Sequence, residues 1–412
     1  MVRSVYCPRS VLVMSGILAG ACLFLQCMNN ASRQREQPNN GMYDQYAGSQ
    51  ACLSCHKNIV DSFMHSPHQL SSQPATPETI MGSFETGKNQ FQLDPGSTVM
   101  MEKRNGRFYQ VQYERGVEKK ARQFDVCIGS GTRGQTYLYW WKDTLFQLPL
   151  TYFTAVAQWC NSPGYPGKVA FGRPITSRCL ECHTTYAHSI SSPGAQFEKF
   201  DHRILYGVGC EKCHGPGARH IAFQQQHPTE GEGRYIQNPA TFSRRQSLDL
   251  CSLCHGGRLT ATQPAFSFQP GDTLSNYFAV DTSAGNAANI DVHGNQYGLL
   301  AASKCFRMSQ MTCLTCHQPH QKETGQTALF SQRCISCHTS GSDHSCSMKS
   351  LTTAQKEKNC IDCHMPLQAS RSIMVFLQGQ STLTSATMRS HYIRIYPPET
   401  KKFLSSNKKS NL

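Results

Sequence analysis

One short pattern, Cys-x-x-Cys-His, occurs seven times in this chain and is the part of the sequence best suited to chemistry. The seven copies use 14 of the 21 cysteines and seven of the 17 histidines. The motif cysteines are Cys52 and Cys55, Cys179 and Cys182, Cys210 and Cys213, Cys251 and Cys254, Cys313 and Cys316, Cys334 and Cys337, and Cys360 and Cys363. The motif histidines are His56, His183, His214, His255, His317, His338 and His364.

This spacing is the one that covalent haem attachment needs. Two thiols three residues apart reach the two vinyl groups of one porphyrin, and the adjacent histidine then binds the iron. Zinc sites need no histidine after every second cysteine, and redox dithiols normally occur once per domain. A disulfide framework would not repeat one short spacing seven times. The sequence therefore predicts seven covalently bound c-type haems.

Ten histidines lie outside the motifs, more than the seven needed for a second axial ligand on every iron. His320 and His220 follow motif histidines too closely to bind the same iron from its opposite face, so we expect them to serve neighbouring haems. His68 is preferred over His65 after the first motif. The predicted distal ligands, including those supported by the resemblance described below, are His68, His220, His293, His320, His344 and His391.

The basic composition, with a formal net charge of +14, needs no nucleic-acid partner to explain it. Each haem carries two propionates, so seven haems could add up to 14 negative charges, and we predict no nucleic-acid binding. Only 39% of the residues are hydrophobic, which favours a bulky apolar cofactor as part of the buried surface.

The first residues have the layout of an export signal. Arg3 and Arg9 precede an uncharged, largely apolar stretch over 10–26. The letters AGAC resemble a lipoprotein cleavage box that would leave Cys22 lipidated, and Cys27 is a second candidate. A plain signal peptide and an uncleaved membrane anchor are the alternatives. All three place the bulk of the chain outside the cytoplasm, in the periplasm with a lipid anchor by the preferred reading.

Residues 84–175 contain neither a motif nor a histidine and have the alternation of strands. FYQVQYE and KKARQFDV flank an Arg-Gly turn, and YLYWW and LFQLPL flank Lys142-Asp143. We expect short helices and loops wrapped around a haem array, with this antiparallel β-insert between the first and second motifs. Disulfides are possible between Cys127 and Cys160 and, on weaker grounds, between Cys305 and Cys346. The expected division is a signal peptide over 1–26, a polar tether over 27–45, a first haem segment over 46–83, the β-rich insert over 84–175, a six-haem domain over 176–398 and a disordered tail over 399–412.

Several motifs carry additional residues that point to a family. SxHxxS follows the first motif, GVGCEKCHGPGxxH contains the third, MTCLTCHQPH the fifth, and CxxCHMP with SHYIRIYP closes the chain. Together they resemble the multihaem cytochromes of the cytochrome c five-fifty-four type, whose superfamily includes octahaem hydroxylamine oxidoreductase and pentahaem nitrite reductase. The resemblance implies closely packed haem pairs, iron with two histidine ligands, and electron conduction. It supports the distal set given above and places a ligand or pocket histidine at His293. The CxxCK motif of the nitrite reductases is absent.

Three functions are compatible with these patterns. The first is an electron carrier that receives electrons from a quinol-oxidising membrane complex or another cytochrome. The second is an oxidoreductase that acts on a small nitrogen or sulfur compound at one five-coordinate haem, with Asp291, His293 and Tyr297 as pocket candidates. The third is a structural subunit that docks a partner enzyme through the β-insert.

Overall fold

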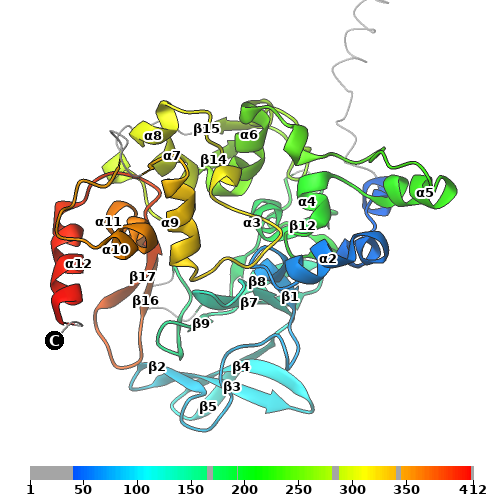
Figure 1. Ribbon diagram of the computed structural model, residues 1–412. Helices are drawn as coiled ribbons and strands as arrows, with labels where there is room; N and C mark the ends of the chain where they lie inside the picture. Colours follow the sequence, from blue (N-terminus) through cyan, green and yellow to red (C-terminus); the bar gives the residue numbers. More distant parts are fainter. Residues whose placement is uncertain (1–39, 165–169, 193, 281–286, 340–344, 410–412) are drawn as a thin grey trace, which may run out of the picture. The chain divides into compact units, whose positions relative to one another are not determined.

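A computed structural model describes residues 40–164, 170–192, 194–280, 287–339 and 345–409 (Figure 1). The predicted signal peptide, most of the tether and His344 lie outside these residues. The chain divides into two compact units, Met1–Asp44 and Gln45–Leu412, and the second carries all seven motifs. No helix in the described part of the chain is both long enough and apolar enough to cross a membrane.

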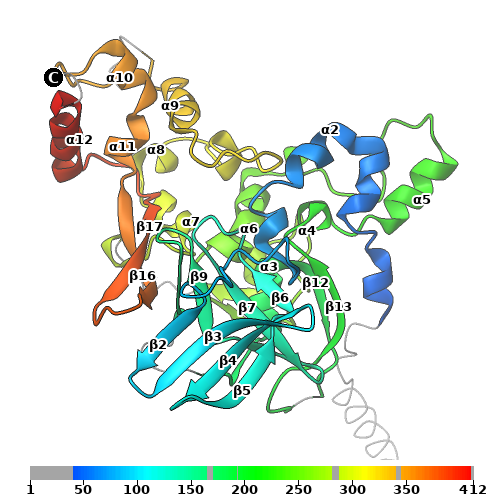
Figure 2. The same ribbon diagram turned by 90° about the horizontal axis from the view of Figure 1, so that it is seen from below.

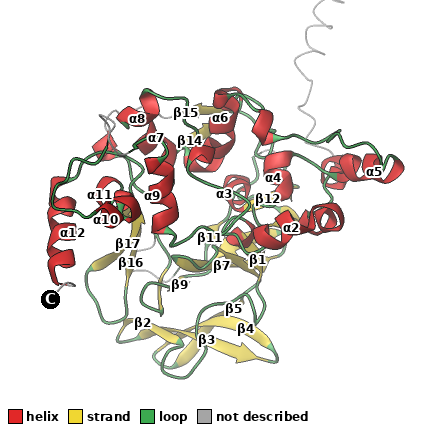
Figure 3. Ribbon diagram, viewed as in Figure 1, coloured by secondary structure: helices red, strands yellow, loops and turns green. Residues whose placement is uncertain are grey.

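In the second unit, the strands between the first two motifs lie apart from most of the motif helices. Figure 3 shows the strands between the first two motifs gathered on one side of this unit and the motif helices on the other, and Figure 2 shows the same from a second direction. Four strands form an antiparallel meander: β2 (Gln90–Asp94), β3 (Ser97–Arg104), β4 (Arg107–Glu114) and β5 (Val117–Gln123). The expected Arg-Gly turn joins β4 to β5, with both residues at positive φ.

A seven-stranded sheet is built from β1, which precedes this meander, and from strands that follow it. Its order is β1-β6-β7-β8-β11, with β9 pairing β7 and β10 pairing β9. The predicted turn at Lys142-Asp143 joins β7 to β8. The strands are β1 (Ser72–Pro74), β6 (Val126–Ile128), β7 (Gly134–Trp141), β8 (Thr144–Gln147), β9 (Leu150–Phe153), β10 (Gln158–Asn161) and β11 (Arg173–Pro174).

The strands enclose a hydrophobic core of their own. Trp159, Tyr137, Met101 and Val99 are each at most 2% exposed and belong to one cluster. The Trp159 indole N–H donates to the Ser83 carbonyl at 2.8 Å, which satisfies its polar atom. This part of the molecule therefore has a side-chain core that does not depend on the cofactor, in contrast to the expectation from composition.

Three two-stranded hairpins complete the β structure: β12 (Thr184–Ser189) with β13 (Phe200–Tyr206), β14 (Leu259–Ala261) with β15 (Phe278–Val280), and β16 (Leu367–Phe376) with β17 (Leu383–Arg389). The pairing of β16 with β17 is interrupted between Ala369 and Met374. The Phe376 N–H donates to the Asn161 side-chain oxygen at 2.5 Å, which joins this last hairpin to the seven-stranded sheet.

The helices are short because little chain separates the motifs. The α-helices are α2 (Leu53–Phe63), α3 (Ser177–His183), α4 (Cys210–His214), α5 (Ala218–Gln226), α6 (Arg244–His255), α7 (Gln296–Ala301), α8 (Lys304–Arg307), α9 (Thr327–Ile335), α10 (Thr353–Lys358), α11 (Cys360–His364) and α12 (Pro397–Lys409). Turns of 3₁₀-helix lie at η1 (Asn40–Gln45), η2 (Ser49–Cys52), η3 (Gln69–Ser71), η4 (Pro239–Thr241), η5 (Leu274–Asn276), η6 (Ala287–Asn289) and η7 (Cys313–Thr315).

Two expectations differ from the structure. The tail from residue 399, expected to be disordered, is helical through Lys409 in α12, where Pro397 and Pro398 begin the helix and Glu399 lies in its first turn. The proposed disulfides are absent, because every cysteine in the described part of the chain is a free thiol, including Cys305 and Cys346.

The geometry explains why the buried pair is not bonded. Cys127 lies on β6, 3.8 Å from the Thr79 hydroxyl, in the core around Trp159. Cys160 lies on β10, donates to the Thr151 carbonyl at 3.4 Å, and packs with a different cluster.

Candidate haem-binding site

All seven motifs lie on or at the end of a short helix. The third and seventh motifs are themselves helices, α4 and α11, while the second and fourth end α3 and α6. Residues three and four apart share one face of a helix. Each motif can therefore present two thiols and an imidazole to one side, as attachment of a single porphyrin requires.

Thiols of different motifs lie in hydrogen-bond contact. These hydrogen bonds lower the pKa of Cys210 to about 6 and that of Cys182 to about 7, and they raise the pKa of the partner thiols. The same effect lowers the pKa of Cys360 to about 6. The four contacts are Cys52 with Cys210, Cys182 with Cys254, Cys251 with Cys313, and Cys334 with Cys360.

Backbone contacts hold these motifs together. Arg178 donates to the Leu253 carbonyl at 2.7 Å, which joins α3 to α6. Arg333 donates to the Cys316 carbonyl at 2.5 Å and forms an ion pair with Glu323, which joins the fifth motif to the sixth. The first motif thus meets the third, and the second, fourth, fifth, sixth and seventh form a continuous series.

Three pairs of imidazoles face one another across nearly the same distance. Two imidazoles on opposite sides of one iron, each nitrogen about 2 Å from the metal, place their ring centroids roughly 6 Å apart. The observed centroid distances are 5.9 Å for His214 with His320, 6.1 Å for His317 with His391, and 6.2 Å for His68 with His255. Each pair joins a motif histidine to a predicted distal histidine from a distant part of the chain.

Hydrogen bonds fix the tautomer of several motif histidines and predicted distal histidines. The Nδ1 of His214 donates to the Gln237 carbonyl at 2.9 Å, and that of His364 donates to the Arg394 carbonyl at 3.0 Å. The His220 Nδ1 donates to a carbonyl in the same way, at 2.9 Å. With Nδ1 protonated, Nε2 carries the free lone pair that binds a metal.

Burial keeps two of the facing rings in the neutral form that binds a metal. Desolvation by the surrounding protein lowers the pKa of His68 and of His391 to about 4 in each case, and nearby imidazoles add to the effect. Both rings are therefore neutral at pH 7, the form that coordinates iron. The Nδ1 of His391 is buried without a hydrogen-bond partner among the described residues. These residues fit haem iron.

Two of the residues suggested for an enzyme pocket make contacts within the protein. The Asp291 carboxylate accepts hydrogen bonds from Ser370, Arg371 and Ser372 on β16, at distances that include 2.7 Å from the Ser372 N–H. Tyr297 packs edge-on against Phe306, 6.3 Å between ring centroids. The Asp291 carboxylate is therefore engaged by β16, and the oxidoreductase hypothesis stays a prediction.

His293 is close enough to His183 and to His255 to lower the pKa of each, after the larger effect of desolvation. His56 lies at a kink in α2, with φ of −114° and ψ of 37°, and the structure describes no imidazole in ring contact with it. His188 instead pairs with Asp201, 3.1 Å from Nδ1 to the carboxylate.

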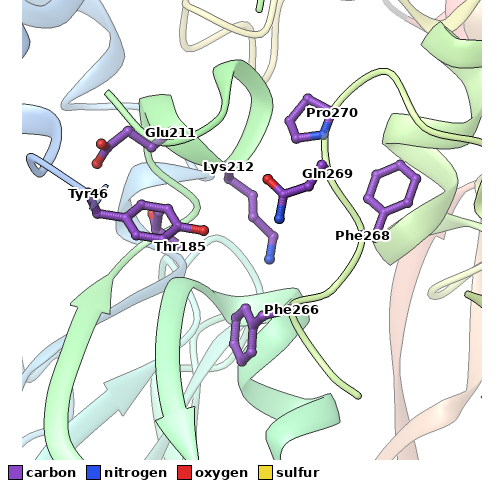
Figure 4. Close-up of a pocket in the computed structure, with 8 residues that line it drawn as sticks. All are labelled: Tyr46, Thr185, Glu211, Lys212, Phe266, Phe268, Gln269 and Pro270. Atoms are coloured by element: carbon purple, nitrogen blue, oxygen red, sulfur yellow. The ribbon is translucent and has the colours of Figure 1, made fainter. Parts of the chain in front are cut away.

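Two cavities border the third motif. One, of about 360 Å³, is lined by His214, Tyr235 and Gln237. Figure 4 shows the other, a smaller cavity in which the side chain of Lys212 extends beside Gln269 toward the ring of Phe266. The Lys212 ammonium lies 4.7 Å from the centre of that ring.

Sequence reasoning missed the residues between the motif cysteines and the groups that orient the rings. Glu211, only 3% exposed, accepts from the N–H groups of Ala47, Gly48 and Gly217 at 2.7–2.8 Å. Gln296 accepts from the His255 Nδ1 at 3.2 Å. The one sign of this in the sequence was the carboxylate of Glu211 inside the third motif, because a carboxylate that is buried there needs hydrogen-bond partners.

Comparison with known proteins agrees with the motifs. The family of cytochrome c554 and c-prime matches residues 168–215, which contain the second and third motifs. The C-type polyheme cytochrome OmcB of Geobacter sulfurreducens is 24% identical over 42% of this chain and 24% of its own length. The dissimilatory sulfite reductase MccA of Wolinella succinogenes is 25% identical over 53% of this chain and 31% of its own length. The chain thus spans about a quarter to a third of the length of these relatives.

The fold has a counterpart among solved structures. The crystal structure of the outer cell wall cytochrome OcwA superimposes with a TM-score of 0.53 and 16% identity, over 87% of this chain and 81% of that one. At this sequence identity, the similarity to OcwA concerns the fold alone. Repeated CxxCH helices, facing imidazoles and these relatives lead to one conclusion: the chain is a multihaem c-type cytochrome.

Proposed function

We propose that this chain binds seven haems covalently, one at each CxxCH motif, and conducts electrons among them. The observation that carries the proposal is the set of three imidazole pairs at 5.9–6.2 Å. The haem supplies reversible one-electron chemistry. The chain's own contribution is to attach, orient and space these groups.

The distances between ring centroids support three axial pairs: His214 with His320, His317 with His391, and His255 with His68. His293, which lowers the pKa of His183 after the larger effect of desolvation, would then serve the second motif. His220 and His344 remain as distal ligands for other motifs. Two-histidine iron is closed to substrates and poised at low potential, which suits electron transfer.

The thiol contacts support a continuous path. Each sulfur would become a thioether at the edge of a porphyrin, so contact between sulfurs of two motifs brings two haem edges together. The second motif would lead through the fourth, fifth, sixth and seventh. The first would join through the third, since His320, opposite the third motif's His214, follows the fifth motif's His317 by three residues.

The proposed setting is outside the cytoplasm, with a lipid anchor at Cys22 or Cys27. The support is the apolar stretch over 10–26 after two arginines. A quinol-oxidising membrane complex or another cytochrome would supply electrons, and a periplasmic or surface acceptor would receive them.

The alternative is an oxidoreductase acting on a small nitrogen or sulfur compound at one five-coordinate haem. The similarity to MccA, named as a sulfite reductase, and the position of His56 without a facing imidazole among described residues favour it. In that case the haem of the first motif is the one open to substrate.

Electron paramagnetic resonance of the oxidised protein separates the two functions. The carrier is expected to give only low-spin signals and no carbon monoxide binding after reduction. A high-spin signal from one haem in seven, together with carbon monoxide binding, would replace it with the oxidoreductase.

A further inference from the structure

The segment 290–296 is anchored on one side to the β16–β17 hairpin. The Asp291 carboxylate accepts from the N–H groups of Arg371 at 3.1 Å and Ser372 at 2.7 Å, and from the hydroxyls of Ser370 and Ser372. These donors lie where the pairing of β16 with β17 is interrupted. Because the ladder does not use these amides, a carboxylate with two acceptor oxygens can take several of them at once.

The other side of the same segment reaches the fourth motif. The Gly294 carbonyl accepts from the Gly257 N–H at 2.9 Å, two residues after His255. The Gln296 side chain accepts from the His255 Nδ1 at 3.2 Å and donates to the Val292 carbonyl at 3.2 Å. Val292 is 3% exposed, which holds the middle of the segment in place.

His293 lies between these two anchors. Its own N–H donates to Asp291 at 3.3 Å, so the carboxylate constrains the backbone that carries the imidazole. His255 already faces His68, with 6.2 Å between ring centroids. The second motif's helix α3, which ends at His183, is joined to α6 by the hydrogen bond from Arg178 to the Leu253 carbonyl, so His183 is the neighbouring motif histidine that remains for His293.

We propose that Asp291 is a positioning residue, whose carboxylate fixes segment 290–296 against the β16 interruption so that His293 serves as the distal ligand opposite His183. The inference rests on the proposed function, because it assumes haem at the second motif. Without the carboxylate, the segment would keep its contacts to the fourth motif but lose the anchor nearest to His293. The imidazole would then move away from the iron, and that haem would become five-coordinate.

The test uses the full chain with haem attached. The variants are Asp291→Ala, Asp291→Asn and His293→Ala. The control is Asp125→Ala, which removes a carboxylate that accepts from the Trp140 N–H at 2.7 Å within the β region. The readouts are the high-spin resonance signal of the oxidised protein and carbon monoxide binding by the reduced protein.

We expect one haem in seven to become high-spin and to bind carbon monoxide in Asp291→Ala and in His293→Ala. Added imidazole should return both variants to low spin. Asp291→Asn keeps one acceptor oxygen and should convert a smaller fraction, which also gives a second variant if Asp291→Ala folds poorly. Asp125→Ala should leave the spectrum unchanged.

The outcomes separate the two claims. If both Asp291 variants stay fully low-spin while His293→Ala gains a high-spin haem, the positioning role is overturned and the ligand assignment stands. If His293→Ala itself stays fully low-spin, the proposed ligand set fails, and the positioning role fails with it.

Discussion

At the residue scale, the motif histidines could be predicted from the sequence, but their partners could not. CxxCH is a local pattern, so adjacency alone identifies the proximal ligand. A distal ligand is set by the fold, and His68 and His255 meet although they lie far apart in the sequence. The sequence predicts that His320 serves a neighbouring haem, and its ring lies 5.9 Å from that of the third motif's His214.

Removing His320 should open the haem held by His214. We expect His320→Ala to add one high-spin haem, because no other imidazole is described in ring contact with His214. The measurement is electron paramagnetic resonance of the oxidised variant. His202→Ala is the control, because His202 contacts no motif histidine in these interactions: its ring stacks on that of Trp140, 3.9 Å between centroids, and pairs with Asp143. A fully low-spin His320→Ala protein would refute the pairing.

Glu323 should make the link between the fifth and sixth motifs sensitive to acid. A hydrogen bond from Arg333 holds the pKa of Glu323 below its ordinary value. A carboxyl whose folded pKa is depressed stabilises the fold above its unfolded pKa, about 4.3 for glutamate, and loses that contribution as the pH falls through the folded value.

Glu323→Gln should therefore have a lower melting temperature than the parent protein near neutral pH. Its melting temperature should also fall less than that of the parent protein when the pH is lowered. Thermal unfolding followed between pH 7 and pH 3 measures this. Glu357→Gln, on the exposed face of α10, is the control. Parallel pH curves for Glu323→Gln and the parent would contradict the role given to the ion pair.

At the element scale, several strands could be predicted from the sequence, whereas the C-terminal helix could not. Strand-like segments flanking two turn sequences predicted β4, β5, β7 and β8, although their burial differs: every residue of β8 is buried, whereas none of β5 is. The polar α12 lacked such a signal, and it packs on α11, whose position depends on the seventh motif. The free thiols of Cys127 and Cys160 show the same limit, since cysteine content alone cannot tell which strands are neighbours.

The β region should tolerate no side chain at Gly82. A Cβ there would overlap the indole ring of Trp159, a fully enclosed member of the core. We expect Gly82→Ala to destabilise this region by about 1–3 kcal/mol, the usual cost of overpacking. Chemical denaturation followed by Trp fluorescence measures it. Gly172→Ala, where a Cβ meets no atom within 4 Å, should have little effect. Equal stability of the two variants would contradict this packing.

At the scale of the whole molecule, a β region with its own core adjoins a helical part whose helices are too short to be stable alone. α4 and α11 have five residues each, and their positions are set by contacts between motifs. Covalent attachment of haem would supply both the buried surface and the cross-links that such helices lack. The sequence predicted this dependence through motif count and low apolar content, but the order in which motifs meet required the structure.

The central claim is that each CxxCH motif carries one haem through two thioether bonds. Intact-mass measurement of the denatured, mature protein, produced with a haem-attachment system, tests it directly. The account predicts a polypeptide that stays coloured after denaturation and is heavier by the mass of seven haems. A colourless protein at the bare polypeptide mass, or one with a smaller number of haems, would contradict it.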